Sequence, residues 1–372
     1  MNCDFKSIIS QFQIDGNFIK AEAYGCGHIN DTYAVYLDKA GAVYRVLLQR
    51  INSNIFSDVD GLMNNILGVT SYLREKIAAR GGDPDRETLT VIKTKDGAPY
   101  YKDAEGGCWR VYVFIEDTIT LQSARTNDDL ISCGSAFGGF LRDLADYKAE
   151  TLAEVIPDFH NTPKRMEALK KAIAEDKMGR AASVKDEIDF ALARNELASK
   201  ITDALSAGTI PLRVTHNDTK LNNTLVDAET QECICVIDLD TVMPGSALYD
   251  YGDAIRFSAS TGAEDETDLT KVNFDLGLFE AFTKGYIEAS GGSLTNGEMS
   301  LMPTAAMIMT FECGIRFLTD YLEGDTYFKI HRPNHNLDRC RTQFKLVADM
   351  EMKYNDMESV VEKIKKNSGN ER

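Results

Sequence analysis

The sequence predicts an α+β protein in which a small antiparallel sheet is followed by a larger, mainly helical part. Two observations predict this division. Short runs of β-branched and aromatic residues, separated by turn residues, fill the first ~115 positions. Beyond residue 126 the apolar residues recur mostly at helical spacing. The 372 residues are enough for two lobes. We expect these to comprise residues 1–117 and 118–372, with the functional site in the cleft between them.

The N-terminal part is expected to begin with strands and one long helix. Residues 22–38 predict a strand, a glycine turn and a second strand, and residues 42–50 predict another strand. Apolar residues at helical spacing over 56–78, after the start signals Ser57 and Asp58, predict the helix.

Two further strand segments complete this part. Residues 89–101 predict a hairpin that turns at an Asp-Gly pair. Residues 108–116 are mostly apolar, which predicts a strand at the centre of the sheet. Trp109, the only tryptophan, is expected in the core there.

The helical part begins at the capping side chains of residues 126–129. Further helical patterns cover residues 163–175, 185–206, 274–290, 296–322 and 335–365. Only residues 212–240 interrupt them, with three short strand-like pieces. If the second and third of these form a hairpin, the polar residues that flank them meet at one end of a small sheet.

Composition excludes several classes of protein. The net charge of −17 argues against a nucleic-acid-binding protein and against binding to an anionic membrane surface. No apolar run reaches the ~20 residues of a membrane span, and the N-terminus lacks the pattern of a signal peptide. Eight cysteines without a CxxC pair are typical of reduced thiols. We therefore expect a cytoplasmic protein, and no feature requires more than a monomer.

The segment VTHNDTKLNN, followed by VIDLD, holds the strongest candidate site. Asp218 follows one strand-like piece, Asn223 lies in the loop after it, and Asp238 ends the next apolar run. Two carboxylates and an amide oxygen at one edge of a sheet repel one another unless a cation lies between them, and such oxygen ligands suit Mg²⁺ completed by phosphates. The alternative is that each of these residues caps a turn.

The pattern H-x-D-x₄-N followed by I-D-x-D resembles the aminoglycoside phosphotransferase and choline kinase superfamily, which has a two-lobed protein-kinase-like fold. Within it, segments between about residues 20 and 350 resemble the bacterial N-acetylhexosamine 1-kinases. These segments are GHIN, WRVY-FIE, LRVTHNDTKLNN, IDLDT-MPGS, DYGDAIRF, ECGIRFL-DYLEGD-YF and HNLDR-RTQ-KLV. The resemblance implies an ATP-dependent kinase that phosphorylates the C1 hydroxyl of N-acetylglucosamine or N-acetylgalactosamine, with Mg²⁺ as cofactor, to give the α-1-phosphate.

The resemblance also implies roles for residues of the central segment. Asp218 matches the catalytic base that accepts the proton of the sugar hydroxyl, and Asn223 and Asp238 match the Mg²⁺ ligands. Asp240 would share a strand face with Asp238 and could make a second metal contact. Lys220 is either a phosphate contact or a solvated loop residue.

Other segments are implied to bind the two substrates. Residues that match sugar contacts are His28, Asp218, Arg316 and Tyr327; for Arg316 a structural salt bridge is the alternative. Residues that match the nucleotide-binding positions are Gly25, Gly27, Gln49, Phe114, Glu116 and Asn223.

One departure from kinase-like enzymes leaves rival functions open. Gln49 or Arg50 stands where a strand lysine is expected, and the following helix has no glutamate before Glu75. The rivals are another small-alcohol kinase (homoserine, choline or methylthioribose kinase), a non-catalytic nucleotide-binding pseudokinase, and a Mg²⁺-dependent phosphatase or nucleotidyl hydrolase.

Overall fold

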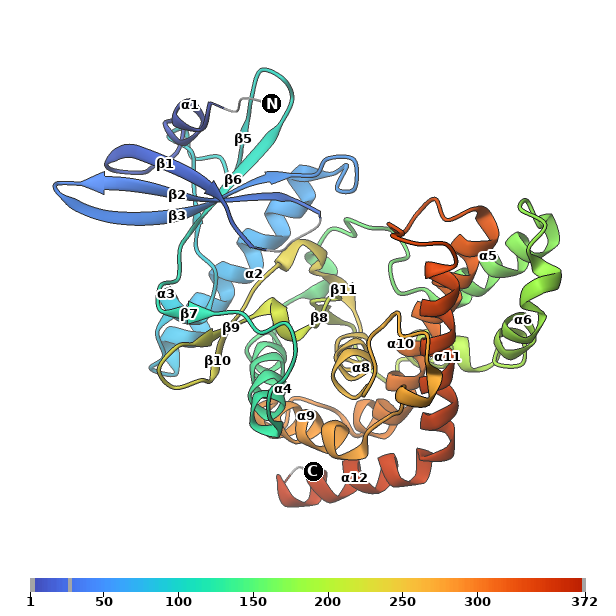
Figure 1. Ribbon diagram of the computed structural model, residues 1–372. Coiled ribbons are helices and arrows are strands. Elements are labelled where there is room, and N and C mark those ends of the chain that lie inside the picture. The colour runs from blue at the N-terminus through green and yellow to red at the C-terminus, as the bar shows by residue number, and fades with distance from the viewer. Residues whose placement is uncertain (1–3, 26–28, 370–372) are drawn as a thin grey trace.

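A computed structural model describes residues 4–25 and 29–369, and it has the predicted two-part architecture (Figure 1). The N-terminal part contains a six-stranded antiparallel sheet of order β1-β2-β3-β6-β4, with β5 also pairing with β6. Its strands are β1 (Asn17–Ala23), β2 (Asp31–Lys39), β3 (Ala42–Ile51), β4 (Val91–Ile92), β5 (Tyr101–Lys102) and β6 (Cys108–Val113). The predicted central position of β6 is confirmed, because β3, β4 and β5 all pair with it.

The hairpin predicted over 89–101 is wrong in its pairing. The chain does turn at Gly97, whose φ of 90° is left-handed. Its two arms, β4 and β5, however, pair with β6 and not with each other. A local turn signal does not show which neighbouring strand offers the better hydrogen-bonding edge.

Helices cover the sheet and connect it to the rest of the molecule. They are α1 (Phe5–Ile9), α2 (Val59–Ala79) and the short α3 (Pro84–Glu87). Asp58 accepts a hydrogen bond from the amide of Gly61, so the predicted start of α2 is confirmed. The apolar face of α2 belongs to the large core that continues into the helical part. Trp109 is buried in a separate small core with α1, as predicted.

Two small sheets lie at the junction of the two parts. Strand β7 (Thr118–Ile119) pairs with β9 (Thr224–Asp227), which forms the expected hairpin with β10 (Cys233–Val236). Strand β8 (Arg213–Thr215) pairs with β11 (Met243–Gly245), a strand that the sequence pattern did not predict.

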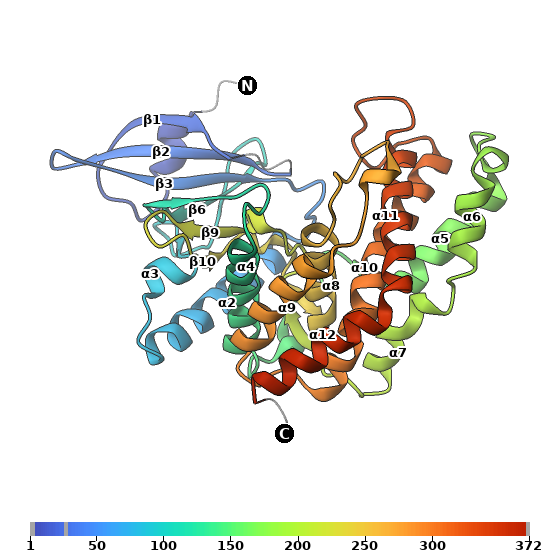
Figure 2. The same cartoon turned by 60° about the horizontal axis from the view of Figure 1, so that its bottom comes forward.

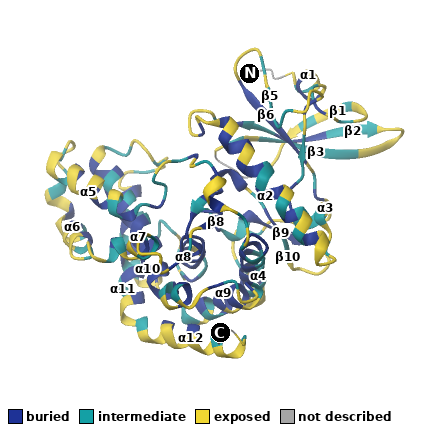
Figure 3. Ribbon diagram, turned by 180° about the vertical axis from the view of Figure 1, so that it is seen from behind, coloured by how far each residue is buried: buried dark blue, intermediate teal, exposed yellow. Residues whose placement is uncertain are grey.

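The C-terminal part is mainly helical. Its α-helices are α4 (Asn127–Asp143), α5 (Thr162–Glu175), α6 (Lys185–Leu192), α7 (Lys200–Ser206), α8 (Ala247–Ser258), α9 (Leu276–Ala289), α10 (Asn296–Glu323), α11 (His335–Met352) and α12 (Tyr354–Asn367). Helix α10 is buried by its neighbours (Figure 3). Among the residues described, α10 alone is long and apolar enough to cross a membrane, but 83% of its most apolar stretch is buried inside the protein.

Two of the predicted helices are broken. The pattern over 185–206 divides into α6 and α7 at a turn where Arg194 pairs with Glu351 of α11, at 2.7 Å. The pattern over 335–365 divides at Lys353, whose ammonium donates to the carbonyl of Phe274. This second turn allows α12 to pack on α9 and α10 (Figure 2). Apolar spacing continues through both turns, so periodicity alone does not show them.

Helices α4 and α9 approach each other backbone to backbone. A Cβ atom on Gly134 would lie 2.3 Å from the carbonyl oxygen of Phe282, and one on Gly138 would lie 2.3 Å from that of Tyr286. Only glycine permits this contact. It places Phe137 of α4 with its ring edge-on to His216, the first residue of the candidate site.

Candidate active site

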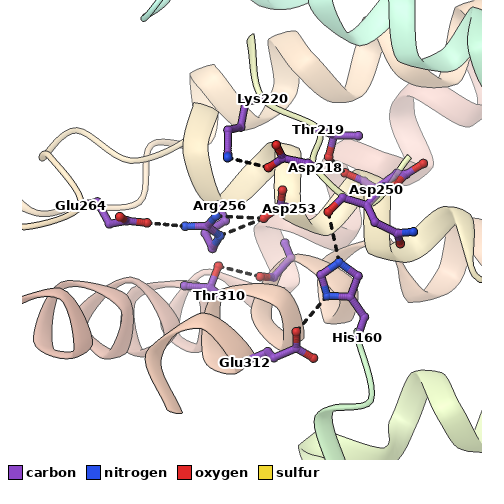
Figure 4. Close-up of polar contacts among 12 residues, drawn as sticks. His160, Asp218, Thr219, Lys220, Asp250, Asp253, Arg256, Glu264, Thr310 and Glu312 are labelled. Atoms are coloured by element: carbon purple, nitrogen blue, oxygen red, sulfur yellow. Dashed lines mark hydrogen bonds and ion pairs between the residues drawn. The ribbon is translucent and has the colours of Figure 1, made fainter. Parts of the chain in front are cut away.

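The loop that connects β8 to β9, residues 216–223, is stabilised by hydrogen bonds with Asp250 of α8 (Figure 4). The buried carboxylate of Asp250 accepts hydrogen bonds from the amides of His216, at 2.8 Å, and Asn217, at 2.7 Å. Thr219 donates its hydroxyl to the carbonyl of Asp250. These bonds fix a turn in which Asn217 has a left-handed φ of 65°. No sequence pattern indicated this role of Asp250.

His216 supports the loop by hydrogen bonds. Its Nε2 lies 2.8 Å from the carbonyl oxygen of Ile237, and its Nδ1 lies 3.2 Å from the amide of Asp218. The side chain is fully buried. His216 therefore links the 216–223 loop to the segment that carries Asp238.

Asp218 is a half-buried carboxylate with two side-chain partners. Lys220 Nζ lies 2.6 Å from Oδ1, and Asn223 Nδ2 donates to Oδ2 at 2.9 Å and to the carbonyl of Asp218 at 2.7 Å. Burial alone would raise the pKa of Asp218, but the charge of Lys220, with smaller contributions from His216 and Asn223, outweighs burial and lowers it. Asp218 is therefore ionised near neutral pH.

Asp238 follows β10 in a left-handed conformation, with φ 61° and ψ 57°. The residue is exposed to solvent, although many protein atoms lie around its carboxylate. No hydrogen bond to this carboxylate is found from the described residues. Burial, together with the negative charges of Asp240 and Asp218, raises the pKa of Asp238 to about 6. The amide of Ile237 donates to the carbonyl of Asn223 at 2.9 Å, so the two acid-bearing segments lie side by side.

The expectation that Asp238 and Asp240 share a strand face is wrong. The left-handed turn at Asp238 ends the extended backbone, and residues 239–241 form a 3₁₀ turn. Asp240 instead points toward the N-terminal part. Its Oδ1 forms an ion pair at 2.5 Å with Nη1 of Arg110, without the alignment of a good hydrogen bond, and its Oδ2 accepts from Asn30 Nδ2 at 2.5 Å.

Gln49, the residue in place of the strand lysine, contacts the same arginine. Arg110 Nε donates to Gln49 Oε1 at 2.9 Å, and Gln49 Nε2 donates to Thr32 at 3.0 Å. Arg110 lies on β6 directly across from Gln49 and is 1% exposed. A charged residue within the apolar strand CWRVYV is costly without acceptors, and this signal could have identified Arg110 from the sequence.

The other nucleotide-binding candidates lie near the junction of the two parts or in the turn between β1 and β2. The centre of the Phe114 ring lies 5.3 Å from the centre of the Tyr24 ring. The guanidinium carbon of Arg45 lies 3.7 Å from the centre of the Phe114 ring. The carboxylate of Glu116 pairs with Arg45 at 2.7 Å. Gly25 has a φ of 78°, which suits a tight turn. Two predicted positions, Gly27 and His28, lie outside the residues described.

Arg316 and Tyr327, the two described candidates for sugar contacts outside the 216–223 loop, lie near each other, and Arg316 forms no salt bridge within the described residues. The Arg316 guanidinium is 6.0 Å from the ring centre of Tyr327, 6.0 Å from that of Phe159 and 5.4 Å from that of Phe328. No acidic partner of Arg316 is found in the described part of the chain. A second cation, Arg165, lies close enough that burial and the charge of Arg316 lower its pKa.

Asp320 positions the segment that carries Tyr327, a role that the sequence analysis missed. Its buried carboxylate accepts hydrogen bonds from the amides of Thr326, Tyr327 and Phe328 at 2.8, 2.8 and 2.9 Å, and from Asn336 Nδ2 at 2.8 Å. The side chain of Tyr327 remains 72% exposed.

His160 connects this region to the 216–223 loop. Its Nδ1 lies 2.8 Å from Oε1 of Glu312 on α10, and its Nε2 lies 3.3 Å from the carbonyl oxygen of Asn217 (Figure 4). The neighbouring Phe159 contacts Arg316. The Arg316 region and the loop with Asp218 are thus adjacent sides of one site.

The oxygen atoms of Asn223 and Asp238 provide part of a binding site for a divalent cation. No group of three or more His, Cys, Asp or Glu side chains suited to a metal is found among the described residues. Asn223 and Asp238 alone are too few ligands for a closed protein site. They do fit a Mg²⁺ ion that takes its remaining ligands from phosphates and water, and the Asp238 carboxylate, which no described residue hydrogen-bonds, is available to bind it.

Solved structures with similar folds identify the fold of this chain. An aminoglycoside phosphotransferase from Alicyclobacillus acidocaldarius matches with a TM-score of 0.61 at 12% identity, over 99% of this chain and 97% of that one. Choline kinase from Cryptosporidium parvum matches with a TM-score of 0.55 at 16% identity, over 94% and 93%. Spectinomycin phosphotransferase in complex with ADP and spectinomycin matches with a TM-score of 0.51 at 13% identity, over 95% and 94%. The fold is therefore the protein-kinase-like fold of small-molecule phosphotransferases.

The family follows from the sequence itself. Residues 22–284 match the model of the phosphotransferase enzyme family APH, and this chain belongs to that family. The predicted superfamily and fold class are confirmed.

Proposed function

We propose that the protein transfers the γ-phosphoryl group of ATP to the anomeric hydroxyl of N-acetylglucosamine or N-acetylgalactosamine. The observation that carries this proposal is the pairing of two sides in one site. One side presents an ionised Asp218 beside Asn223 and Asp238, and the other presents Arg316 among aromatic rings without an acidic partner. The first side suits phosphoryl transfer to a hydroxyl, and the second suits a neutral sugar.

Asp218 is assigned as the base that orients the attacking hydroxyl and accepts its proton. The contact with Lys220 and the bond from Asn223 fix the direction of the carboxylate and keep it ionised. Phosphoryl transfer depends mostly on positioning and charge stabilisation, so such a fixed carboxylate is the main contribution needed from the protein. Lys220, which lies between Asp218 and Asp253, is placed to meet a transferred phosphoryl group.

Asn223 and Asp238 are assigned as the residues that hold Mg²⁺. When bound, the ion would offset the negative charge of the phosphates. The left-handed turn directs the Asp238 carboxylate away from the strand, and the bond between Ile237 and Asn223 keeps both ligands at neighbouring positions. Gly25, Gln49, Phe114 and Glu116 are retained as proposed nucleotide-binding positions, and Gly27 and His28 as proposed contacts outside the described residues.

The charge around Arg316 favours a neutral acceptor that offers oxygen atoms. Arg316 and Arg165 place two cations near each other, and the buried Nε atom of Arg165 has no hydrogen-bond partner among the described residues. A cationic acceptor such as choline would be repelled there, whereas hydroxyl and acetamido oxygens accept hydrogen bonds from guanidinium groups. The exposed ring of Tyr327 provides a wall for a sugar.

The test is an ADP-release assay with a panel of acceptors at fixed ATP and Mg²⁺. The panel contains both N-acetylhexosamines, the corresponding plain hexoses, homoserine, choline and methylthioribose. We expect turnover of an N-acetylhexosamine to a non-reducing α-1-phosphate, identified by NMR. Turnover of another alcohol, with neither N-acetylhexosamine accepted, would refute the substrate assignment.

The same assay separates the other classes of function. A pseudokinase would bind ATP and release no ADP with any alcohol, and a hydrolase would release phosphate without an acceptor. The arrangement around Asp218 opposes the first of these, because its bonds would have no use in a silent protein. The kinase-like fold opposes the second, since a hydrolase needs no separate lobe to enclose ATP.

A further inference from the structure

We infer that Arg110 is a positioning residue for the metal-binding carboxylate, and that it does so by holding Asp240 from the N-terminal sheet. This inference rests on the proposed metal site at Asn223 and Asp238. It identifies the contact that replaces the strand lysine and helix glutamate, which this sequence lacks.

The first support is the convergence of the N-terminal part on residues 238–242, here called the metal segment. Arg110 of β6 and Asn30 both contact the carboxylate of Asp240, at 2.5 Å each. Asn65, on the buried face of α2, donates to the carbonyl of Val242 at 2.9 Å. The sheet and the helix that would carry the lysine and the glutamate thus each contact the metal segment directly.

The second support is the backbone of Asp238 itself. A left-handed conformation is uncommon at residues other than glycine and persists where its surroundings stabilise it. On one side, Ile237 is held by Asn223 and His216. On the other side, the buried side chain of Asp240 is held by Arg110. Loss of Arg110 would remove the charged partner of Asp240 and leave only neutral hydrogen bonds on this side, from Asn30 to Asp240 and between Thr241 and the 216–223 loop.

The third support is that Arg110 has a fixed geometry of its own. Its side chain is 1% exposed, Gln49 accepts from Nε at 2.9 Å, and its guanidinium lies 5.2 Å from the ring centre of Tyr112. Both oxygens of the Asp240 carboxylate therefore contact protein side chains, and Asp238 is the carboxylate of this segment that can bind a cation.

The experiment measures how much Mg²⁺ strengthens ADP binding, by calorimetry on the full chain with and without the ion. Arg110→Lys keeps the positive charge but cannot contact Gln49 and Asp240 with two separate nitrogens as the guanidinium does. We expect it to reduce the Mg²⁺-dependent gain in ADP affinity about 10–100-fold, the usual cost of losing a residue that orients a metal ligand, while metal-free ADP binding stays near the wild-type value. Asp240→Asn, which removes the partner charge at the same shape, should have the same effect.

Arg213→Lys is the matched control. Arg213 is also a buried arginine, paired with Glu298 at 2.9 Å, but it lies on β8 and contacts no residue of the metal segment through its side chain. It should lower the melting temperature and leave the Mg²⁺-dependent gain intact. If Arg110→Lys does not fold, Asp240→Asn provides the test, through the same ratio of ADP affinity with Mg²⁺ to ADP affinity without it.

The outcomes separate this inference from the function it rests on. A wild-type gain that persists unchanged in folded Arg110→Lys or Asp240→Asn protein overturns the inference alone. The absence of any gain in the wild-type protein overturns the proposed metal site, and the inference with it.

Discussion

The two sides of the site differ in how their side chains are held. On the phosphate side, Asp218 has two side-chain partners and its loop is bonded to Asp250 and His216. On the acceptor side, the Arg316 guanidinium lies near three aromatic rings and forms no ion pair within the described residues, and Tyr327 is mostly exposed. The difference teaches that the groups for chemistry are arranged in advance, whereas the groups for recognition keep hydrogen-bonding capacity for a ligand.

The largest expected effect tests the phosphate side. Asp218→Asn keeps the size of the side chain and removes its ability to accept a proton. We expect turnover to fall about 10²–10⁴-fold, with ADP affinity and melting temperature near the wild-type values. Steady-state kinetics and calorimetry measure these quantities. Turnover within a few-fold of wild type would remove Asp218 from the role of base.

The next effect tests the acceptor side. Arg316→Met keeps the length of the side chain and its contact with Phe328 but removes the guanidinium donors. We expect the KM for the N-acetylhexosamine to rise about 10–100-fold, because hydrogen bonds from a charged group contribute about 1.5–3 kcal/mol, while the KM for ATP changes little.

A matched control for this variant is Arg194→Met, at another arginine over an aromatic ring. Arg194 lies 3.3 Å from the ring centre of Phe190 but pairs with Glu351 on the outer helices. It should leave both KM values unchanged. Equal KM values for the sugar in wild type and Arg316→Met would contradict the recognition role.

A smaller effect is expected at the support of the acceptor side. Asp320→Asn retains one carbonyl oxygen but loses the charge that accepts three amide bonds. We expect the KM for the sugar to rise about tenfold, with kcat at saturating sugar within a few-fold of wild type. A lower melting temperature with an unchanged KM would show that Asp320 supports only the fold.

The smallest effect is expected for Tyr327→Phe, which removes one hydroxyl and keeps the ring. A neutral hydrogen bond contributes about 0.5–1.5 kcal/mol, so the KM for the sugar should rise about 2–10-fold. An effect as large as that of Arg316→Met would mean that the exposed hydroxyl is as firmly engaged as the guanidinium, and the contrast between the two residues would fail.

Local patterns predicted the elements better than their connections. The start of α2, the central strand β6 and the β9–β10 hairpin follow from capping, apolar runs and turn residues, and all are confirmed. The pairing of β4 and β5 with β6, the turn at Lys353 and the strand pair β8–β11 depend on distant partners, which no local pattern contains.

The candidate site divides in the same way. Asp218, Asn223 and Asp238 stand close in sequence with a recognisable spacing, and the structure brings them together. Arg110, Asp250 and Asp320 lie far from the residues they support, so their roles become visible only through contacts across the fold. Asp240 was misplaced because the left-handed turn at Asp238 changes the alternation that a strand would have.

The bonds made by Asp320 have a consequence for how this enzyme could acquire new acceptors. They anchor residues 326–328 at a single point on a buried helix, and this anchor does not depend on the remainder of the connection from α10 to α11. Within that remainder, Arg332 pairs with Asp338 and donates to the carbonyl of Asp265, so it holds the loop to α11 and to a second loop. Directed evolution of acceptor range is therefore best aimed at residues 329–331 and 333, with Asp320 and Arg332 left untouched.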